Sequence, residues 1–172
     1  MTSHGKATTF KLRPTTPEER ETRIFRSLGA NEKPQVGAEI PLFIMQGIDG
    51  KTYRSTDLKG NVVVLSFWIS LNKPFWGEKQ ATGLSQVLQP FQTETGLISL
   101  GVLNNTEQEV KTFLVSNTVP FVPVPESYGF HKKYQVTRSP SFLVIDRTGK
   151  IAAFIEGGEY EALKASLRQV TK

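Results

Sequence analysis

Residues 61–78 read NVVVLSFWISLNKPFWGE and are the most informative stretch of the chain. Residues 61–68 form a continuous apolar run rich in valine, which is typical of a central strand buried on both faces. The next residues stay largely apolar, but Asn72, Lys73 and Pro74 interrupt them. Because loops that follow a buried strand often carry function, we expect a functional site, or its remains, in this segment.

The composition is that of an ordinary globular protein. The chain has 172 residues, of which 38% are hydrophobic and 22% charged. The net charge of +5 is modest and the basic residues are scattered, so we expect no nucleic acid partner. No apolar run approaches the ~18 residues of a membrane span. The sequence has no cysteine, which excludes disulfides, thiolate metal sites and thiol nucleophiles.

We expect two parts, a polar tail with a short helix in residues 1–35 and a single domain in residues 36–172. Thr16 and Glu19 form a predicted capping box at the start of that short helix. The amino-terminal residues contain no apolar segment typical of a secretory signal, which predicts a cytoplasmic protein. A mature organellar or periplasmic chain that has lost its targeting segment is the alternative.

Strands are predicted from apolar runs and turn residues. Asp49-Gly50 indicates a tight turn between two extended segments. Residues 97–103 and 142–145 are apolar runs, which predicts two strands beside residues 62–68. The three prolines of residues 119–125 restrict that segment to a sheet edge or a connection, since proline donates no hydrogen bond to a neighbouring strand.

Helices are predicted between and after these strands. Helical spacing indicates two buried helix faces, formed by Leu84, Val87, Leu88 and Phe91, and by Leu163, Leu167 and Val170. Pro90 is expected to kink or end the first of them. Thr106 and Glu109 form a capping box for another helix, and residues 127–136 predict a short one. The order of elements predicts an α/β fold in which helices flank a central mixed sheet.

Several short motifs follow one another in a familiar order. They are Gly37 with IPLF at 40–43, DGK at 49–51, DLKG at 57–60, VVVLSFW at 62–68, SPSFL with ID at 139–146 and TGKI at 148–151. Together they resemble the thioredoxin fold and, within it, the redoxin group related to AhpC/TSA. This group includes the TlpA- and ResA-type thiol-disulfide oxidoreductases. The resemblance covers residues 36–170 and implies a three-layer thioredoxin-like sandwich, to which the short helix predicted in residues 1–35 adds an N-terminal helical extension.

In that family, Phe-Trp is followed by a short loop and a Cys-x-x-Cys motif at the start of a helix. Alignment on Phe67-Trp68 and Glu78 places Asn72 and Phe75 at the two cysteine positions. Pro74 keeps the place of the second internal residue. The family's reaction requires a thiolate and a resolving thiol, so the resemblance implies a redox site that has lost its chemistry.

Two roles for the altered site stay open. In a structural role, Asn72 caps the following helix and Phe75 adds packing. In a binding role, the site retains a surface formed by Leu71, Phe75, Trp76, Ser139 and Pro140. The resemblance implies that a cis peptide bond precedes Pro140 and that this proline faces the site. Trp76 has a further alternative, which is burial in the core.

No other chemistry is indicated. His4 and His131 are the only histidines and lack metal-ligand spacing, and we expect His131 on a helix surface. Phosphate loops and nucleophile elbows are absent, so we expect neither metal nor cofactor. We predict a redox-inactive thioredoxin-like domain that acts as a protein-binding or structural module, possibly a subunit of a larger complex. The alternatives are an oxidoreductase or peroxidase of the family type and a chaperone-like binder of extended peptides.

Overall fold

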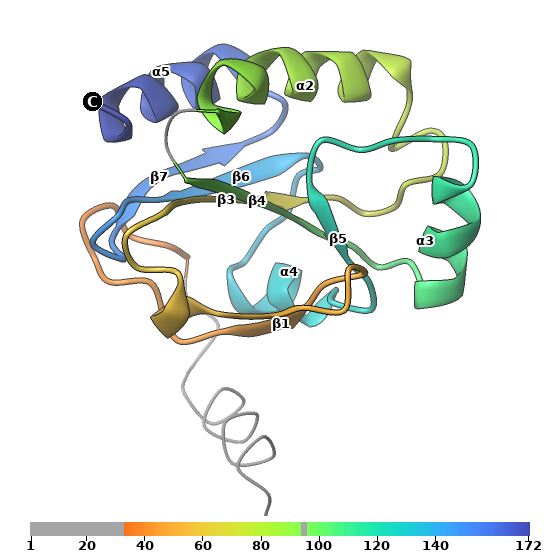
Figure 1. Ribbon diagram of the computed structural model, residues 1–172, viewed down its shortest axis with the longest axis horizontal. Helices are drawn as coiled ribbons and strands as arrows, with labels where there is room; N and C mark the ends of the chain where they lie inside the picture. The colour runs from red at the N-terminus through yellow and green to blue at the C-terminus, as the bar shows by residue number, and fades with distance from the viewer. Residues whose placement is uncertain (1–32, 94–95) are drawn as a thin grey trace, which may run out of the picture.

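The computed structural model describes residues 33–93 and 96–172, so the predicted N-terminal tail and short helix lie outside the described residues. The described strands form a two-stranded hairpin and a five-stranded sheet (Figure 1). The hairpin consists of β1 (Ile44–Gln46) and β2 (Thr52–Arg54). The larger sheet has the order β5-β4-β3-β6-β7, with β3 (Val62–Phe67), β4 (Leu97–Val102), β5 (Val122–Val124), β6 (Ser141–Ile145) and β7 (Ile151–Glu156).

Strand β3 lies at the centre of this sheet, as the valine-rich run predicts. It pairs in parallel with β4 and antiparallel with β6, so the sheet is mixed. All six of its residues are buried. The predicted thioredoxin-like architecture, a central mixed sheet flanked by helices, is therefore confirmed.

Alternate side chains of β3 enter two separate cores. Val62 and Val64 belong to the core under α2 (Glu78–Gln92) and α5 (Tyr160–Val170). Val63, Leu65 and Phe67 belong to the core on the other face, under the hairpin and α4 (Gly129–Lys133). Figure 1 shows the two long helices above the sheet, and α4 and β1 below it. A strand whose side chains are buried on both faces needs this three-layer arrangement.

The remaining predicted elements are also present. Asp49-Gly50 lies in the turn between β1 and β2, and Gly50 has a φ of 79°. Strand β5 is one of the two edge strands of the larger sheet, which confirms the prediction for the proline-rich segment. Pro90 lies two residues before the end of α2. Helix α3 (Glu107–Leu114) begins with the predicted capping box of Thr106 and Glu109. No helix in residues 33–93 and 96–172 is long and apolar enough to cross a membrane.

Candidate functional site

The site predicted from sequence lies where β3 ends and β6 begins. Phe67 pairs with Ser141 across these antiparallel strands, so the segments beyond them, residues 68–77 and 137–140, meet at one end of the sheet. The hydroxyl Oγ of Ser139 accepts a hydrogen bond from the backbone N–H of Ile69 at 3.2 Å. The two segments on which the candidate residues lie are therefore joined directly.

The peptide bond between Ser139 and Pro140 is cis, which confirms the prediction for this position. The structure also has a cis bond between Lys73 and Pro74, which the sequence reasoning did not anticipate. The Ser141 hydroxyl donates to the carbonyl of Arg138 at 2.8 Å and fixes the backbone that precedes β6.

Asn72 begins a tight turn and does not cap a helix. Its carbonyl accepts hydrogen bonds from the N–H groups of Phe75 at 3.1 Å and Trp76 at 3.2 Å. Helix α2 begins only at Glu78, and its N-cap is Gly77, whose backbone is extended at φ −157° and ψ −175°. The predicted capping role of Asn72 is therefore wrong, because the extended Gly77 separates the turn from the helix.

The three apolar residues of the predicted binding surface lie in different environments. Leu71 is 2% exposed and Trp76 is 5% exposed, so both belong to the core. Phe75 is 40% exposed. Of the two alternatives for Trp76, burial in the core is correct. The packing role predicted for Phe75 is filled by Trp76 instead. The side chains of this loop that a partner could contact directly are the exposed ones, those of Asn72, Lys73, Pro74 and Phe75.

Trp76 is held by an aromatic cluster beneath the loop. Its ring meets that of Trp68 edge-on, with centroids 4.6 Å apart, and that of Phe121 at 5.6 Å. The Phe121 ring covers Gly101 of β4 so closely that a Cβ atom there would lie 2.2 Å from it. The missing side chain at Gly101 thus makes room for Phe121, which in turn supports Trp76.

Asn105 is a site residue that the sequence reasoning missed. Its side chain is buried at 6% exposure, and its Oδ1 accepts from the N–H of Leu71 at 2.9 Å. Its Nδ2 donates to Ser70 Oγ at 3.3 Å and to Glu109 Oε2 at 3.5 Å. The only sequence signal is a pair of polar residues directly after an apolar strand and before a capping box.

Most backbone donors of the loop are already satisfied. Ile69 donates to Ser139 Oγ, Leu71 to Asn105 Oδ1, and Asn72 to Ser70 Oγ at 3.0 Å. Phe75 and Trp76 donate to the Asn72 carbonyl, and Pro74 has no N–H. A thiolate or other anion at position 72 would therefore find few free amides, unlike an anion at a helix start.

His131 lies below this end of the sheet and is buried, contrary to the predicted surface position. It is 4% exposed, its ring meets Phe67 edge-on at 5.4 Å, and Tyr128 stacks on it at 4.8 Å. Neither ring nitrogen has a hydrogen-bond partner among the described residues. Burial lowers the pKa of His131 to about 4, an effect that the nearby Trp68 backbone opposes only in part. An apolar environment favours the neutral imidazole in this way.

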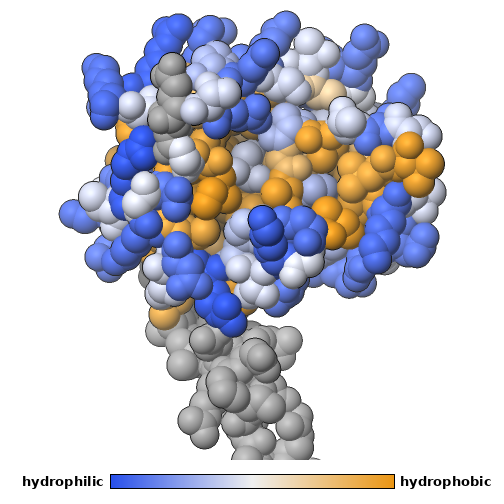
Figure 2. Space-filling view, in the orientation of Figure 1, coloured by the Kyte–Doolittle hydropathy of each residue, from blue (hydrophilic) through white to orange (hydrophobic). Residues whose placement is uncertain are grey.

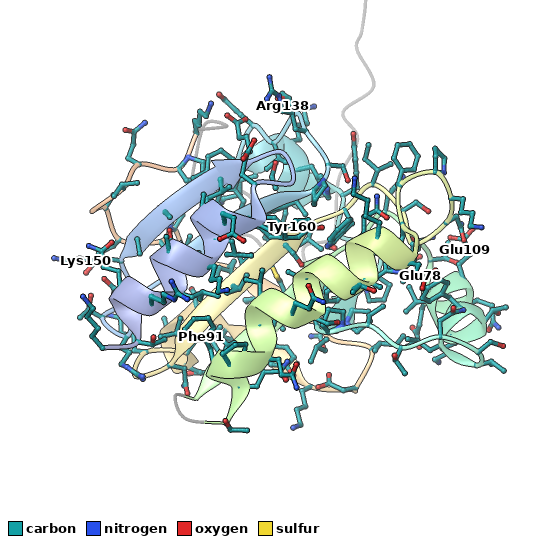
Figure 3. The ribbon with its side chains drawn as sticks, turned by 90° about the horizontal axis from the view of Figure 1, so that it is seen from above. Glu78, Phe91, Glu109, Arg138, Lys150 and Tyr160 are labelled. Atoms are coloured by element: carbon teal, nitrogen blue, oxygen red, sulfur yellow. The ribbon has the colours of Figure 1, made fainter. Side chains whose placement is uncertain are left out.

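The acidic residues near the loop do not form a metal site. Glu78 begins α2 and Glu109 lies on α3, and Figure 3 shows both at the end of the molecule opposite Lys150. Glu109 accepts from the N–H of Thr106 at 2.9 Å as part of the capping box. Residues 33–93 and 96–172 contain no group of three or more histidine, cysteine, aspartate or glutamate side chains placed to hold a metal ion.

Comparison with known proteins assigns this chain to a family. The AhpC/TSA family matches residues 36–154. The thiol-disulfide oxidoreductase ResA of Bacillus cereus is 32% identical over 143 residues, covering 81% of each chain. A putative peroxiredoxin, bcp, of Coxiella burnetii is 29% identical over 133 residues, covering 69% of this chain and 86% of the relative.

Solved structures agree on the fold. A putative thiol:disulfide interchange protein DsbE from Chlorobium tepidum superposes with a TM-score of 0.68 at 23% identity, over 81% of this chain and all of that one. The family match and the ResA similarity show that this chain belongs to the AhpC/TSA family and is a ResA-like, thioredoxin-fold member of it. It is a member without cysteine.

Proposed function

We propose that this chain is a redox-inactive thioredoxin-like domain that binds a protein partner through the segments at the carboxyl end of β3 and the start of β6. The observation that carries the proposal is the exposed Phe75 in a chain without cysteine. An aromatic side chain that leaves 40% of its surface in water contributes little to the core, and aromatic residues are enriched at protein interfaces.

The surroundings of Phe75 support a rigid surface. Leu71 and Trp76 anchor the loop from below, so they support the proposed surface without facing the partner. Ser139 and Pro140 are half-buried and lie across from the loop, where the Ser139 hydroxyl bonds to Ile69. A preorganised surface loses less conformational entropy on binding than a flexible one.

The partner class follows from the family. The relatives are named for thiol-disulfide exchange, a reaction that brings an enzyme into contact with another thiol or disulfide. We propose that this chain retains contact with polypeptide and lacks the exchange step. If the chain is a structural subunit of a larger complex, we propose that it contacts its neighbour through the same surface. The oxidoreductase or peroxidase alternative needs a nucleophile that no cysteine supplies here.

Binding is tested with reduced, carboxymethylated α-lactalbumin, a permanently unfolded polypeptide without free thiols. We expect saturable binding that Phe75→Ala weakens by about tenfold or more, as removal of an interface hot spot does. The matched control is Val115→Ala, because Val115 is also an exposed apolar residue, at 83%, but lies beyond the end of α3. Equal effects of the two substitutions, or no binding by the unaltered protein, would contradict the proposal.

The redox part has its own test. Insulin reduction with dithiothreitol and peroxide consumption with a thiol donor are expected to stay at the rate of buffer alone, because the chain offers no thiolate. Turnover that follows the protein through successive purification steps would contradict this part of the proposal while leaving the binding part intact.

A further inference from the structure

Asn105 connects three loops at the end of the sheet where the proposed binding surface lies. Its side-chain oxygen accepts from Leu71 in the loop after β3. Its backbone carbonyl accepts from the N–H of Glu126, in the segment after β5, at 2.8 Å. Its side-chain nitrogen reaches Glu109, whose carboxylate also caps α3. The segments that follow β3, β4 and β5 therefore meet at this one residue.

The hydrogen bond between the Asn105 side chain and the Leu71 N–H is buried. At 6% exposure the Asn105 amide is nearly removed from water, and both of its polar atoms are used. When a buried hydrogen bond loses one partner, the group left behind stays out of water without a bond, and the protein loses the free energy of desolvating it. Within residues 33–93 and 96–172, the N–H of Leu71 has no acceptor other than the Asn105 oxygen, so the loop conformation depends on this bond.

We infer that Asn105 is the positioning residue of the proposed surface: it holds the turn that presents Phe75 in a fixed place relative to Ser139 and Pro140. The inference rests on the proposed function. Asn105 and Ser139 hold the loop at two alternate amides, those of Leu71 and Ile69. The turn from Asn72 to Trp76 starts directly after these two attachments. Phe75 thereby keeps its place in a chain that has no disulfide to close this turn.

The test is hydrogen exchange of individual amides in the full chain, measured by NMR for Asn105→Ala. We expect the Leu71 amide to exchange at least about tenfold faster, since its protecting hydrogen bond is lost. The Leu100 amide, in the centre of the sheet, is expected to keep its rate. The matched control is Asn117→Ala, because the Asn117 side chain also bonds to the backbone, where it donates to the carbonyl of Phe113, but at the exposed end of α3.

Three results would overturn the inference. They are an unchanged Leu71 rate, equal acceleration of Leu71 and Leu100, and the same acceleration of Leu71 in the Asn117→Ala control. If Asn105→Ala does not fold, Asn105→Asp in a Glu109→Gln background decides. Aspartate keeps the acceptor for Leu71 and loses the donor to Ser70 and to position 109, while glutamine removes the like charge that would otherwise lie beside it. This variant is expected to keep the Leu71 amide protected, and loss of that protection in the folded variant would equally overturn the inference.

A second readout separates positioning from general stability. Binding of reduced, carboxymethylated α-lactalbumin by folded Asn105→Ala is expected to weaken about fivefold, the equivalent of one net hydrogen bond. Unchanged affinity would show that the residue is structural only. The exchange measurement needs no ligand, so failure of the unaltered protein to bind the probe would contradict the proposed function and leave the result at Leu71 standing.

Discussion

The end of β3 and the start of β6 lie side by side, yet only one of them has the conformation that the family pattern predicts. At the start of β6, the cis bond between Ser139 and Pro140 is present as expected. Beyond the end of β3, the expected helix start at Asn72 is replaced by a turn, and α2 begins six positions later at Glu78. The difference lies entirely in the segment where the cysteines would be.

This comparison shows which parts of the site keep the family pattern in a chain without cysteine. The framework that holds the site, including the Ser139 contact to Ile69, does not depend on a thiol. The loop beyond β3 is held by Trp76, whose ring packs edge-on against the rings of Trp68 and Phe121 in the core. Figure 2 shows apolar surface on the side of the molecule where α3 and β5 lie.

The largest expected effect comes from removing Trp76, the residue that anchors the loop beyond β3 in the core. Trp76→Ala should destabilise the protein by ~3–5 kcal/mol, because it leaves a cavity beside the stacked rings of Trp68 and Phe121. Chemical denaturation with a linear extrapolation measures this value. A loss below ~1 kcal/mol would show that Trp76 does not anchor the loop and would remove the main difference between the two segments.

The sequence predicted those parts of the fold that depend on burial and turn geometry. Strand β3 and the hairpin turn at Asp49-Gly50 each follow from local pattern, and the structure has both. The arrangement of the loop was not predictable in this way. Trp76 enters the core and packs on Phe121, whose ring lies over Gly101, and both of these residues lie far from Trp76 in the sequence.

The burial of His131 shows the same limit. A histidine in a short segment with Lys132 and Lys133 suggests a polar helix surface. In the structure Phe67 and Tyr128 enclose its ring from two sides. The role of Asn105 was not predictable either, because its contacts are with Leu71 and Ser70, which lie 34 and 35 positions earlier in the sequence.

The second prediction concerns His131, which is buried beneath the end of β3, and its effect on the stability of the protein in acid. The folded pKa of His131, about 4, lies below the unfolded value of about 6.5, so the unfolded state binds more protons between these values. The contribution of neutral His131 is complete above pH 6.5 and is lost as the pH falls to 4. We expect this loss to reach about 3 kcal/mol.

Carboxylates also titrate in this range, so the measurement compares the unaltered protein with His131→Gln. The unfolding free energy of the unaltered protein should fall more steeply between pH 7 and pH 4 than that of the variant. Parallel curves for the two proteins would mean that His131 protonates in the folded state as easily as in water.

The third prediction restores the cysteines with the double substitution Asn72→Cys and Phe75→Cys. The turn that joins these positions brings them close enough to form an intramolecular disulfide. We expect the thiol at position 72 to keep a pKa of about 8.5, because α2 begins only at Glu78 and the neighbouring amides are occupied. The pH dependence of its alkylation rate measures this pKa. A value below about 7 would indicate that the helix start of the active relatives persists here.

The smallest expected effect on stability is that of Phe75→Ala. Because the side chain is 40% exposed, its truncation should cost about 1 kcal/mol or less. The adjacent positions 75 and 76 then differ several-fold in their contribution to stability, which sharpens the contrast between the exposed and buried sides of the turn. A loss comparable to that of Trp76→Ala would assign Phe75 to the core and remove the reason to propose a binding surface.

The central claim is that the loop beyond β3, together with the start of β6, is a binding surface. Its most direct test is NMR of the isotope-labelled protein during titration with reduced, carboxymethylated α-lactalbumin. We predict that the chemical shift changes gather in residues 69–76 and 137–141 and are largely lost in Phe75→Ala. Changes that gather elsewhere, for example at the end of α3 near Val115, or the absence of changes at saturating probe, would contradict the account.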